Sequence, residues 1–230
     1  MTNNDLRRAR LAKQWGQVHA ATRLGVSQSY LAMLERGQRR LTPKLARRAA
    51  MVYATTPTAV PPAPQGFSAG VAARTLAGDL AGLGYPRLAH LSSRRWVPKN
   101  PGEVLLAALA QENLEPRLVE ALPWLVMRYR DLDWSWVVRE VKVRDLQNRL
   151  GFVVTLANQI AVRVGDQARA ESLAMLEAQL YRSRLAREDT LCQADLRDPE
   201  RRWLTENRSE AARRWNLLTD WTADAVRYVA

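Results

Sequence analysis

Residues 16–35, GQVHAATRLGVSQSYLAMLE, constrain the fold of this chain more than any other stretch. They contain two short segments with helical periodicity, separated by Gly25 and Val26. Glycine at position 25 can adopt the positive φ that a tight turn between helices requires. Ser27 follows at the position of an N-cap, where its hydroxyl can accept a hydrogen bond from a first-turn amide. The stretch therefore predicts two short helices joined by a tight turn.

The helix expected after Ser27 has two different faces. Leu31 and Leu34 fall on one face, three residues apart, and this spacing favours packing against neighbouring helices. The other face is polar without being acidic, and it carries Gln28, Ser29, Ala32, Met33 and Arg36. We expect the leucine face to be buried and the polar face to lie in a groove of DNA.

Residues 4–53 resemble the Cro/cI (Xre-type) helix-turn-helix family of DNA-binding proteins. The matching positions are Gln17, Ala21, Leu24-Gly25-Val26-Ser27, Gln28-Ser29-Tyr30 and Leu34-Glu35-Arg36-Gly37. An ordinary helical hairpin is the weaker interpretation, because so many positions agree at the right offsets. The chain departs from the family at Gly16, where a hydroxyl cap is usual, and at Ala20, where a larger aliphatic residue is commoner. A fifth helix after Tyr53 also has no obvious counterpart.

The resemblance and the expected helix faces assign roles to individual residues. Base contacts are expected from Gln28, Ser29, Ala32 and Met33, because a glutamine in the first turn can bind adenine at two positions and a methionine can contact a thymine methyl. Phosphate contacts are expected from Arg10, Gln17, Tyr30, Arg36, Arg39, Arg40 and Lys44. Gly25, Ser27 and Glu35 are expected to be structural, and the resemblance implies that Arg10 also pairs with Glu35. Partial core packing is the alternative for Met33 and Tyr30, and solvation at the surface is the alternative for Arg10 and Glu35.

The charge of the chain is unevenly placed. Residues 1–53 hold eleven lysines and arginines against Asp5 and Glu35, which is a net +9 of the chain's formal +12. A concentrated basic block favours a polyanionic partner such as double-stranded DNA. A solvated surface in an arginine-rich chain is the alternative, and the helix-turn-helix pattern makes DNA the better interpretation.

Residues 54–70 separate this domain from the rest of the chain. Four prolines between positions 54 and 69 predict an extended linker, because proline lacks a backbone donor and disfavours helix before it. Residues 71–230 show helical spacing and no convincing strand. Helices are expected at 71–83, 104–111, 115–129 with a bend at Pro123, 134–141, 145–162, 166–187, 209–218 and 222–229, with a short one after Asp198. The prediction is an all-α protein: a small helix-turn-helix domain at 1–53, a proline-rich linker and a larger helical bundle or short helical solenoid.

Three features of residues 71–230 have both a functional and a structural interpretation. Asp131 and Asp133 could hold Mg²⁺ in a transferase, but Asp133 is better placed to cap the helix after it. Five tryptophans could form a ligand cage or an interface, although core packing is the better interpretation; they are Trp134, Trp136, Trp203, Trp215 and Trp221. Residues 144–152 mix charges, amides and apolar side chains, which is typical either of a partner surface or of salt-bridged packing between helices.

The sequence therefore predicts a dimeric, sequence-specific repressor that reads the major groove, with residues 71–230 responsible for dimerisation or partner binding. An antitoxin of a toxin–antitoxin or phage-defence operon is the alternative, in which this helical domain neutralises a cognate toxin. Enzymatic activity is not expected, and neither is a cofactor, a metal site or a catalytic residue. The charged N-terminal residues do not resemble a signal peptide, and no stretch is long and apolar enough for a membrane span. Cys192 is the one cysteine, which suits a reducing compartment. A cytoplasmic, nucleoid-associated protein is therefore expected.

Overall fold

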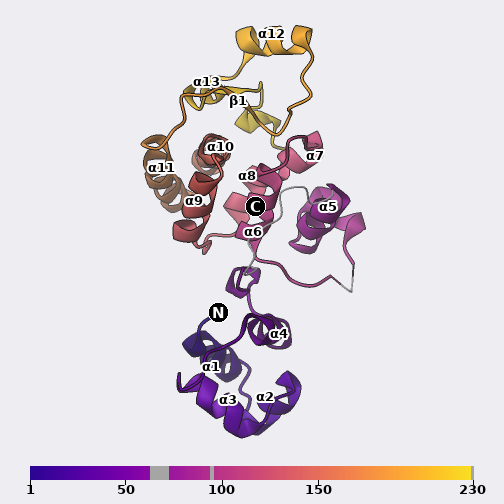
Figure 1. Ribbon diagram of the computed structural model, residues 1–230, viewed down its shortest axis with the longest axis vertical. Helices are drawn as coiled ribbons and strands as arrows, with labels where there is room; N and C mark the ends of the chain where they lie inside the picture. The colour runs from indigo at the N-terminus through magenta and orange to yellow at the C-terminus, as the bar shows by residue number, and fades with distance from the viewer. Residues whose placement is uncertain (63–72, 94–95, 229–230) are drawn as a thin grey trace. The chain divides into compact units, whose positions relative to one another are not determined.

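The computed structural model describes residues 1–62, 73–93 and 96–228, and it is almost entirely helical, as the sequence predicted (Figure 1). The chain divides into two compact units. The first unit contains Met1–Gly66 and Val97–Asn100, and the second contains Phe67–Trp96 and Pro101–Ala230. Each unit has its own cluster of buried apolar side chains.

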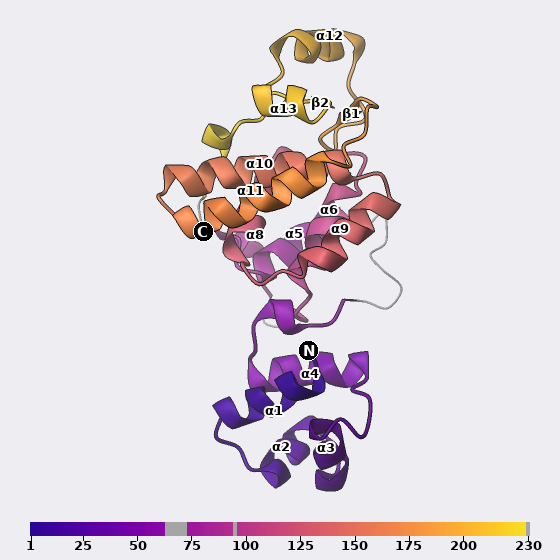
Figure 2. The ribbon, with the colours of Figure 1, turned by 90° about the vertical axis from the view of Figure 1, so that its left-hand side faces the viewer.

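The first unit is built from four helices and a short 3₁₀ turn. They are α1 (Asn3–Ala12), α2 (Gln17–Leu24), α3 (Gln28–Glu35), α4 (Pro43–Tyr53) and η1 (Pro57–Ala59). Figure 2 shows α1 and α4 on one side of the unit, with α2 and α3 together on the other. Leu6, Leu24, Leu31 and Leu34 come from three of these helices and meet Tyr53 of α4 in a fully enclosed core.

The ends of these helices follow local capping rules. Thr42 Oγ1 accepts a hydrogen bond from Leu45 N at 3.3 Å, and Pro43 occupies the first position of α4. The start of α1 follows the same rules. Thr2 is the N-cap, because Asp5 lies three residues later and completes a reciprocal capping box with it.

The segment after α4 is more compact than the extended linker predicted for it. Residues Pro57–Ala59 form a 3₁₀ turn, and Val60 is only 2% exposed. The side-chain amide of Asn100 donates to Val60 O at 2.7 Å and to Thr58 O at 3.3 Å, so a distant part of the first unit fixes this turn. Residues 63–70 of the predicted linker lie outside the described residues.

The second unit is a larger helical assembly. Its helices are α5 (Ala73–Gly82), η2 (Pro86–Leu91), α6 (Pro101–Leu109), α7 (Pro116–Val119), α8 (Ala121–Arg128), α9 (Trp134–Val143), α10 (Gln147–Arg163), α11 (Gln167–Tyr181), α12 (Asp198–Asn207), α13 (Glu210–Arg214) and η3 (Ala223–Ala225). Helix α10 is the centre of the unit: it packs against α11 as a hairpin and also contacts α8, α9 and α13 (Figure 2). Gly151 in α10 lets the ring of Trp215 approach, since a Cβ at that position would lie 2.3 Å from the ring.

Several boundaries in the second unit differ from the predicted helices. The predicted helix 115–129 is divided at Glu120, three residues before the bend predicted at Pro123. The division places Pro123 in the first turn of α8, where its missing N–H costs no helical hydrogen bond. Residues Leu217–Leu218 were expected in a helix but form strand β2, which pairs in parallel with β1 (Asp189–Thr190). The last predicted helix is reduced, over the residues described there, to the 3₁₀ turn Ala223–Ala225.

The predicted roles of the tryptophans hold for four of the five. Trp215 is fully buried and donates from Nε1 to Thr155 Oγ1 at 2.8 Å, while Trp134, Trp136 and Trp221 pack partly buried against the core. For Trp203 the prediction of core packing is wrong, because its side chain is 52% exposed on α12.

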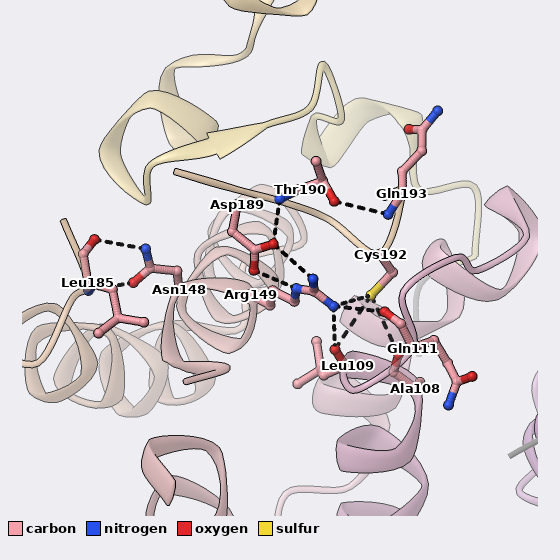
Figure 3. Close-up of polar contacts among 10 residues, drawn as sticks. All are labelled: Ala108, Leu109, Gln111, Asn148, Arg149, Leu185, Asp189, Thr190, Cys192 and Gln193. Atoms are coloured by element: carbon pink, nitrogen blue, oxygen red, sulfur yellow. Dashed lines mark hydrogen bonds and ion pairs between the residues drawn. The ribbon is translucent and has the colours of Figure 1, made fainter. Parts of the chain in front are cut away.

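A buried arginine forms hydrogen bonds that connect three segments of the second unit (Figure 3). Arg149 of α10 forms a two-point ion pair with Asp189, through Nε at 2.7 Å and Nη2 at 2.9 Å. Its Nη1 donates to Leu109 O, in the last residue of α6, at 2.9 Å and to Gln111 O, just after that helix, at 2.8 Å. Cys192 Sγ lies 3.7 Å from the same nitrogen, and burial raises the pKa of this thiol to about 11. The polar run 144–152 therefore contributes internal packing at this position.

Candidate nucleic-acid interface

Helices α2 and α3 form a compact helix-turn-helix. Gly25 has φ +65°, a left-handed conformation that favours glycine. The nearest atoms to a Cβ at this position belong to the guanidinium of Arg48, the far end of an exposed side chain, so the backbone rather than the space requires glycine. Val26 N donates to Ala21 O at 3.0 Å across the turn. Ser27 Oγ accepts from Tyr30 N at 3.2 Å and caps α3, as the sequence predicted.

Helix α3 presents a narrow polar strip, formed by Gln28 and Ser29, to solvent. Leu31 and Leu34 are completely buried against α1 and α2, whereas Gln28 and Ser29 in the first turn are exposed. The expectation that Ala32 contacts bases is not supported, because Ala32 is only 4% exposed. Packing of α3 against two helices buries a wider arc than the leucine spacing alone suggests.

Met33 and Tyr30 lie at the edges of this strip. Both are half-buried, and Tyr30 packs against the apolar core of the first unit. Part of each side chain is therefore available to a partner, and part contributes to packing. The predicted contacts of Met33 with a thymine methyl and of Tyr30 with a phosphate stay predictions.

A chain of side-chain hydrogen bonds connects the first turn of α3 to the interior. Gln28 Nε2 donates to Gln17 Oε1 at 2.8 Å, and Gln17 Nε2 donates to Glu35 Oε2 at 2.9 Å. Arg10 closes the chain with Nε on Glu35 Oε1 at 2.6 Å and Nη2 on Oε2 at 2.8 Å. The sequence indicated each residue separately, but it gave no signal for the link between Gln17 and Gln28. This chain fixes the amide of Gln28 at the solvent-exposed end of a rigid set of contacts.

The ion pair at the inner end of this chain is buried. Burial by itself raises the pKa of Glu35, but hydrogen bonds from Arg10 and Gln17 and the positive charge of Arg10 outweigh it, so the pKa lies below its ordinary value. The third nitrogen of Arg10, Nη1, donates to Trp15 O at 2.7 Å. Arg10 is 7% exposed, so the structure supports its predicted pairing with Glu35 and gives no support to a phosphate contact.

Four of the cations expected at phosphates follow α3 along the chain. Arg36, Arg39, Arg40 and Lys44 are exposed, and all four follow α3 within a single loop and the first turn of α4. The side-chain amide of Asn3 donates to Leu34 O at 2.6 Å and to Arg39 O at 2.8 Å, and thereby fixes the start of this loop against α1. Sequence reasoning missed this role of Asn3, since the partners lie more than thirty residues away.

Comparison with known families supports this geometry. Residues 5–62 match a family model described as a helix-turn-helix domain. The match includes the turn Pro57–Ala59 that follows α4. It supports a helix-turn-helix segment and double-stranded DNA as its partner, but it does not single out the Cro/cI (Xre-type) family. No curated protein and no solved structure matches the chain. The helix-turn-helix domain suggests a DNA-binding regulator.

Three further findings concern the aspartate pair, metal binding and membrane insertion. Asp133 Oδ1 accepts from Trp136 N at 3.0 Å and from Ser135 Oγ at 2.6 Å, so this carboxylate caps α9. Within residues 1–62, 73–93 and 96–228, no group of three or more histidine, cysteine or acidic residues could hold a metal ion. In the same described ranges, the helices are too short or too polar to span a bilayer.

Proposed function

We propose that this protein is a sequence-specific transcriptional repressor that reads the major groove of double-stranded DNA with α3. The observation that carries the proposal is the exposed first turn of α3, where Gln28 is held by Gln17 while the leucines behind it are buried. A first turn oriented in this way suits a recognition helix, whose N-terminal residues contact base edges.

The geometry of Gln28 supports base recognition. One hydrogen of Nε2 is used by Gln17, which leaves the second hydrogen and the carbonyl oxygen of Gln28 available. An adenine presents N7 as an acceptor and N6 as a donor in the major groove, and these two positions match the two remaining groups of the amide. Ser29 can donate or accept beside it and is therefore less selective.

Charge around α3 supports the non-specific part of binding. The exposed side chains of Arg36, Arg39, Arg40 and Lys44 lie in and after the loop that Asn3 holds in place. Contacts of this kind neutralise phosphates and position the protein without reading sequence. Gln17 begins α2, where free backbone N–H groups also favour an anion.

We further propose that the repressor is a dimer assembled through its second unit. A single recognition helix reads only a few base pairs, and helix-turn-helix dimers extend the site by binding two half-sites. In the second unit Val162 of α10 and Met175 of α11 are 63% and 72% exposed, so these neighbouring helices have apolar surface available for burial in an interface. Light scattering of the full chain should give twice the mass of one subunit, and a monomer would contradict the dimer.

Selection from a random pool of duplex DNA tests the function. The full chain should enrich two related half-sites about 10 base pairs apart, centre to centre, or a multiple of that spacing. Arg39→Ala should then reduce the dependence of log affinity on log salt by about one unit, while Arg182→Ala, an exposed arginine of the second unit, should leave it unchanged. Recovery of unrelated sequences would contradict the proposal, and an unchanged salt slope for Arg39→Ala would remove that phosphate contact.

A further inference from the structure

Helix α12 forms one wall of a cavity in the second unit. Figure 1 shows α12 set apart from the other helices of this unit, with a long segment before it. Only two residues separate its end at Asn207 from the start of α13 at Glu210. The cavity has a volume of about 410 Å³. Its apolar lining comes from Leu196, Pro199, Trp203 and Leu204, and its charged lining comes from Glu200 and Asp220. Concave sites of about 300–1,000 Å³ are typical of small-molecule binding.

Trp203 gives this cavity its largest apolar surface. Its side chain is 52% exposed, although Leu204 beside it is buried and fixes α12 to the unit. Pro199, Glu200, Trp203 and Leu204 share one face of the helix through their spacing. A tryptophan that packs against no core and faces a cavity offers the π-face of its ring to a ligand.

The charged groups that line this cavity are acidic, in a chain of formal charge +12. Glu200 Oε2 accepts from Arg197 N at 3.0 Å, which fixes the carboxylate and leaves Oε1 for another donor. Asp220, which lies outside α12, is the second acidic residue of the lining and is exposed. Two arginines of this region are directed to a different carboxylate, because Arg201 and Arg208 both approach Glu188, at 3.4 and 3.5 Å.

We propose that this cavity binds a small organic cation: an amine or quaternary ammonium group attached to an apolar body. Glu200 and Asp220 supply the negative charge that selects a cation. The ring of Trp203 adds a cation–π contact, and Leu196 and Pro199 cover the apolar part of the ligand. The cavity lies wholly within the second unit, so ligand binding there can be tested independently of DNA binding by the first unit.

Three compounds that share one apolar body test the charge preference. Titration calorimetry of the full chain with 2-phenylethylammonium, 2-phenylethanol and phenylacetate compares a cation, a neutral molecule and an anion. The cation should bind most tightly, and the anion should bind most weakly or not at all. Absence of binding by the cation, or equal binding by all three compounds, would overturn the proposal.

Substitutions in the lining locate the site. Trp203→Leu should weaken binding of 2-phenylethylammonium by about two- to thirtyfold, the range of cation–π contributions. Glu200→Gln and Asp220→Asn should reduce the preference for the cation over the alcohol, and the amide oxygen introduced by Glu200→Gln can still accept from Arg197 N. Glu171→Gln, an exposed carboxylate of α11, is the matched control and should bind as wild type. Thermal unfolding verifies that each variant is folded, and wild-type binding by all three cavity variants would overturn the proposal.

Discussion

Each unit of this protein contains a buried arginine that forms a bidentate ion pair with a carboxylate. In the first unit Arg10 binds Glu35 at 2.6 and 2.8 Å and donates to one carbonyl. In the second unit Arg149 binds Asp189 at 2.7 and 2.9 Å and donates to two carbonyls. Local geometry is almost the same in both, yet the surroundings differ.

The difference lies in what each pair is connected to. Glu35 also accepts from Gln17, which accepts from Gln28 at the surface, so the pair in the first unit is linked to a side chain that is exposed to solvent. Arg149 and Asp189 contact backbone carbonyls, the thiol of Cys192 and a strand, and these contacts hold segments of the interior together. One ion pair is therefore linked to the residue that we propose reads bases, and the other holds segments of the interior together. Geometry alone does not distinguish these roles.

The largest effect is expected for the pair in the second unit. Arg149→Met removes the partner of Asp189 and the donor to two backbone carbonyls, so the free energy of unfolding should fall by about 3–5 kcal/mol. Chemical denaturation of the full chain measures it. Arg163→Met breaks an exposed pair with Asp224 and should cost less than about 1 kcal/mol. Similar losses in the two variants would show that Arg149 has no special role.

A somewhat smaller loss of stability is expected for Arg10→Met. The variant leaves Glu35 buried without its main partner, and unfolding of the first unit should become easier by about 3 kcal/mol. Its affinity for DNA should fall as well, because Gln17 and Gln28 lose their fixed partner. Arg8→Met, which removes an exposed pair with Asp5, is the matched control. If Arg10→Met kept full DNA affinity, the pair would be structural in both units.

Acid should weaken the pair in the first unit. The pKa of Glu35 is lower in the folded protein than in the unfolded chain, so its stabilising contribution is complete above about pH 4.3. That contribution is lost as pH falls through the lower, folded-state pKa. The difference in unfolding free energy between wild type and Glu35→Gln should therefore shrink from about pH 6 to pH 3 in denaturant titrations. A difference that did not change with pH would contradict this account of the pair.

The smallest effect on stability is expected for Gln17→Ala. Gln17 is partly exposed, and removing its two hydrogen bonds should cost about 1 kcal/mol or less. Specific DNA binding should fall further than stability suggests, since Gln28 becomes free to rotate. Thr22→Ala removes an exposed hydroxyl of the same helix and serves as the control. If specific affinity were unchanged in Gln17→Ala, the link to Gln28 would have no function.

The parts of the molecule that could be predicted are those set by neighbours in sequence. Gly25 and Ser27 fix a turn and a cap through their own chemistry, and Thr42 with Pro43 does the same for α4. The cap at Thr2 was available by the same rule, because Asp5 stands three residues later. The pair of Arg10 with Glu35 came from the family resemblance.

The parts that could not be predicted depend on contacts between distant residues. Arg149 and Asp189 are forty residues apart, and nothing in either local pattern indicates the other. Leu217 and Leu218 form a strand only because Asp189 and Thr190 lie beside them. Trp203 has the same helical spacing as a core residue, so only the position of α12 shows that it is exposed. Local signals define the helix-turn-helix, and tertiary packing decides the rest.

The most direct test of the central claim is the ratio of specific to non-specific DNA affinity in Gln28→Ala. Competition binding at one salt concentration, with the selected site and a scrambled duplex, measures this ratio. We expect specific affinity to fall by about five- to 150-fold, the value of a good two-point base contact, while affinity for the scrambled duplex stays within about twofold. Equal losses on both duplexes would contradict base reading by the exposed turn of α3.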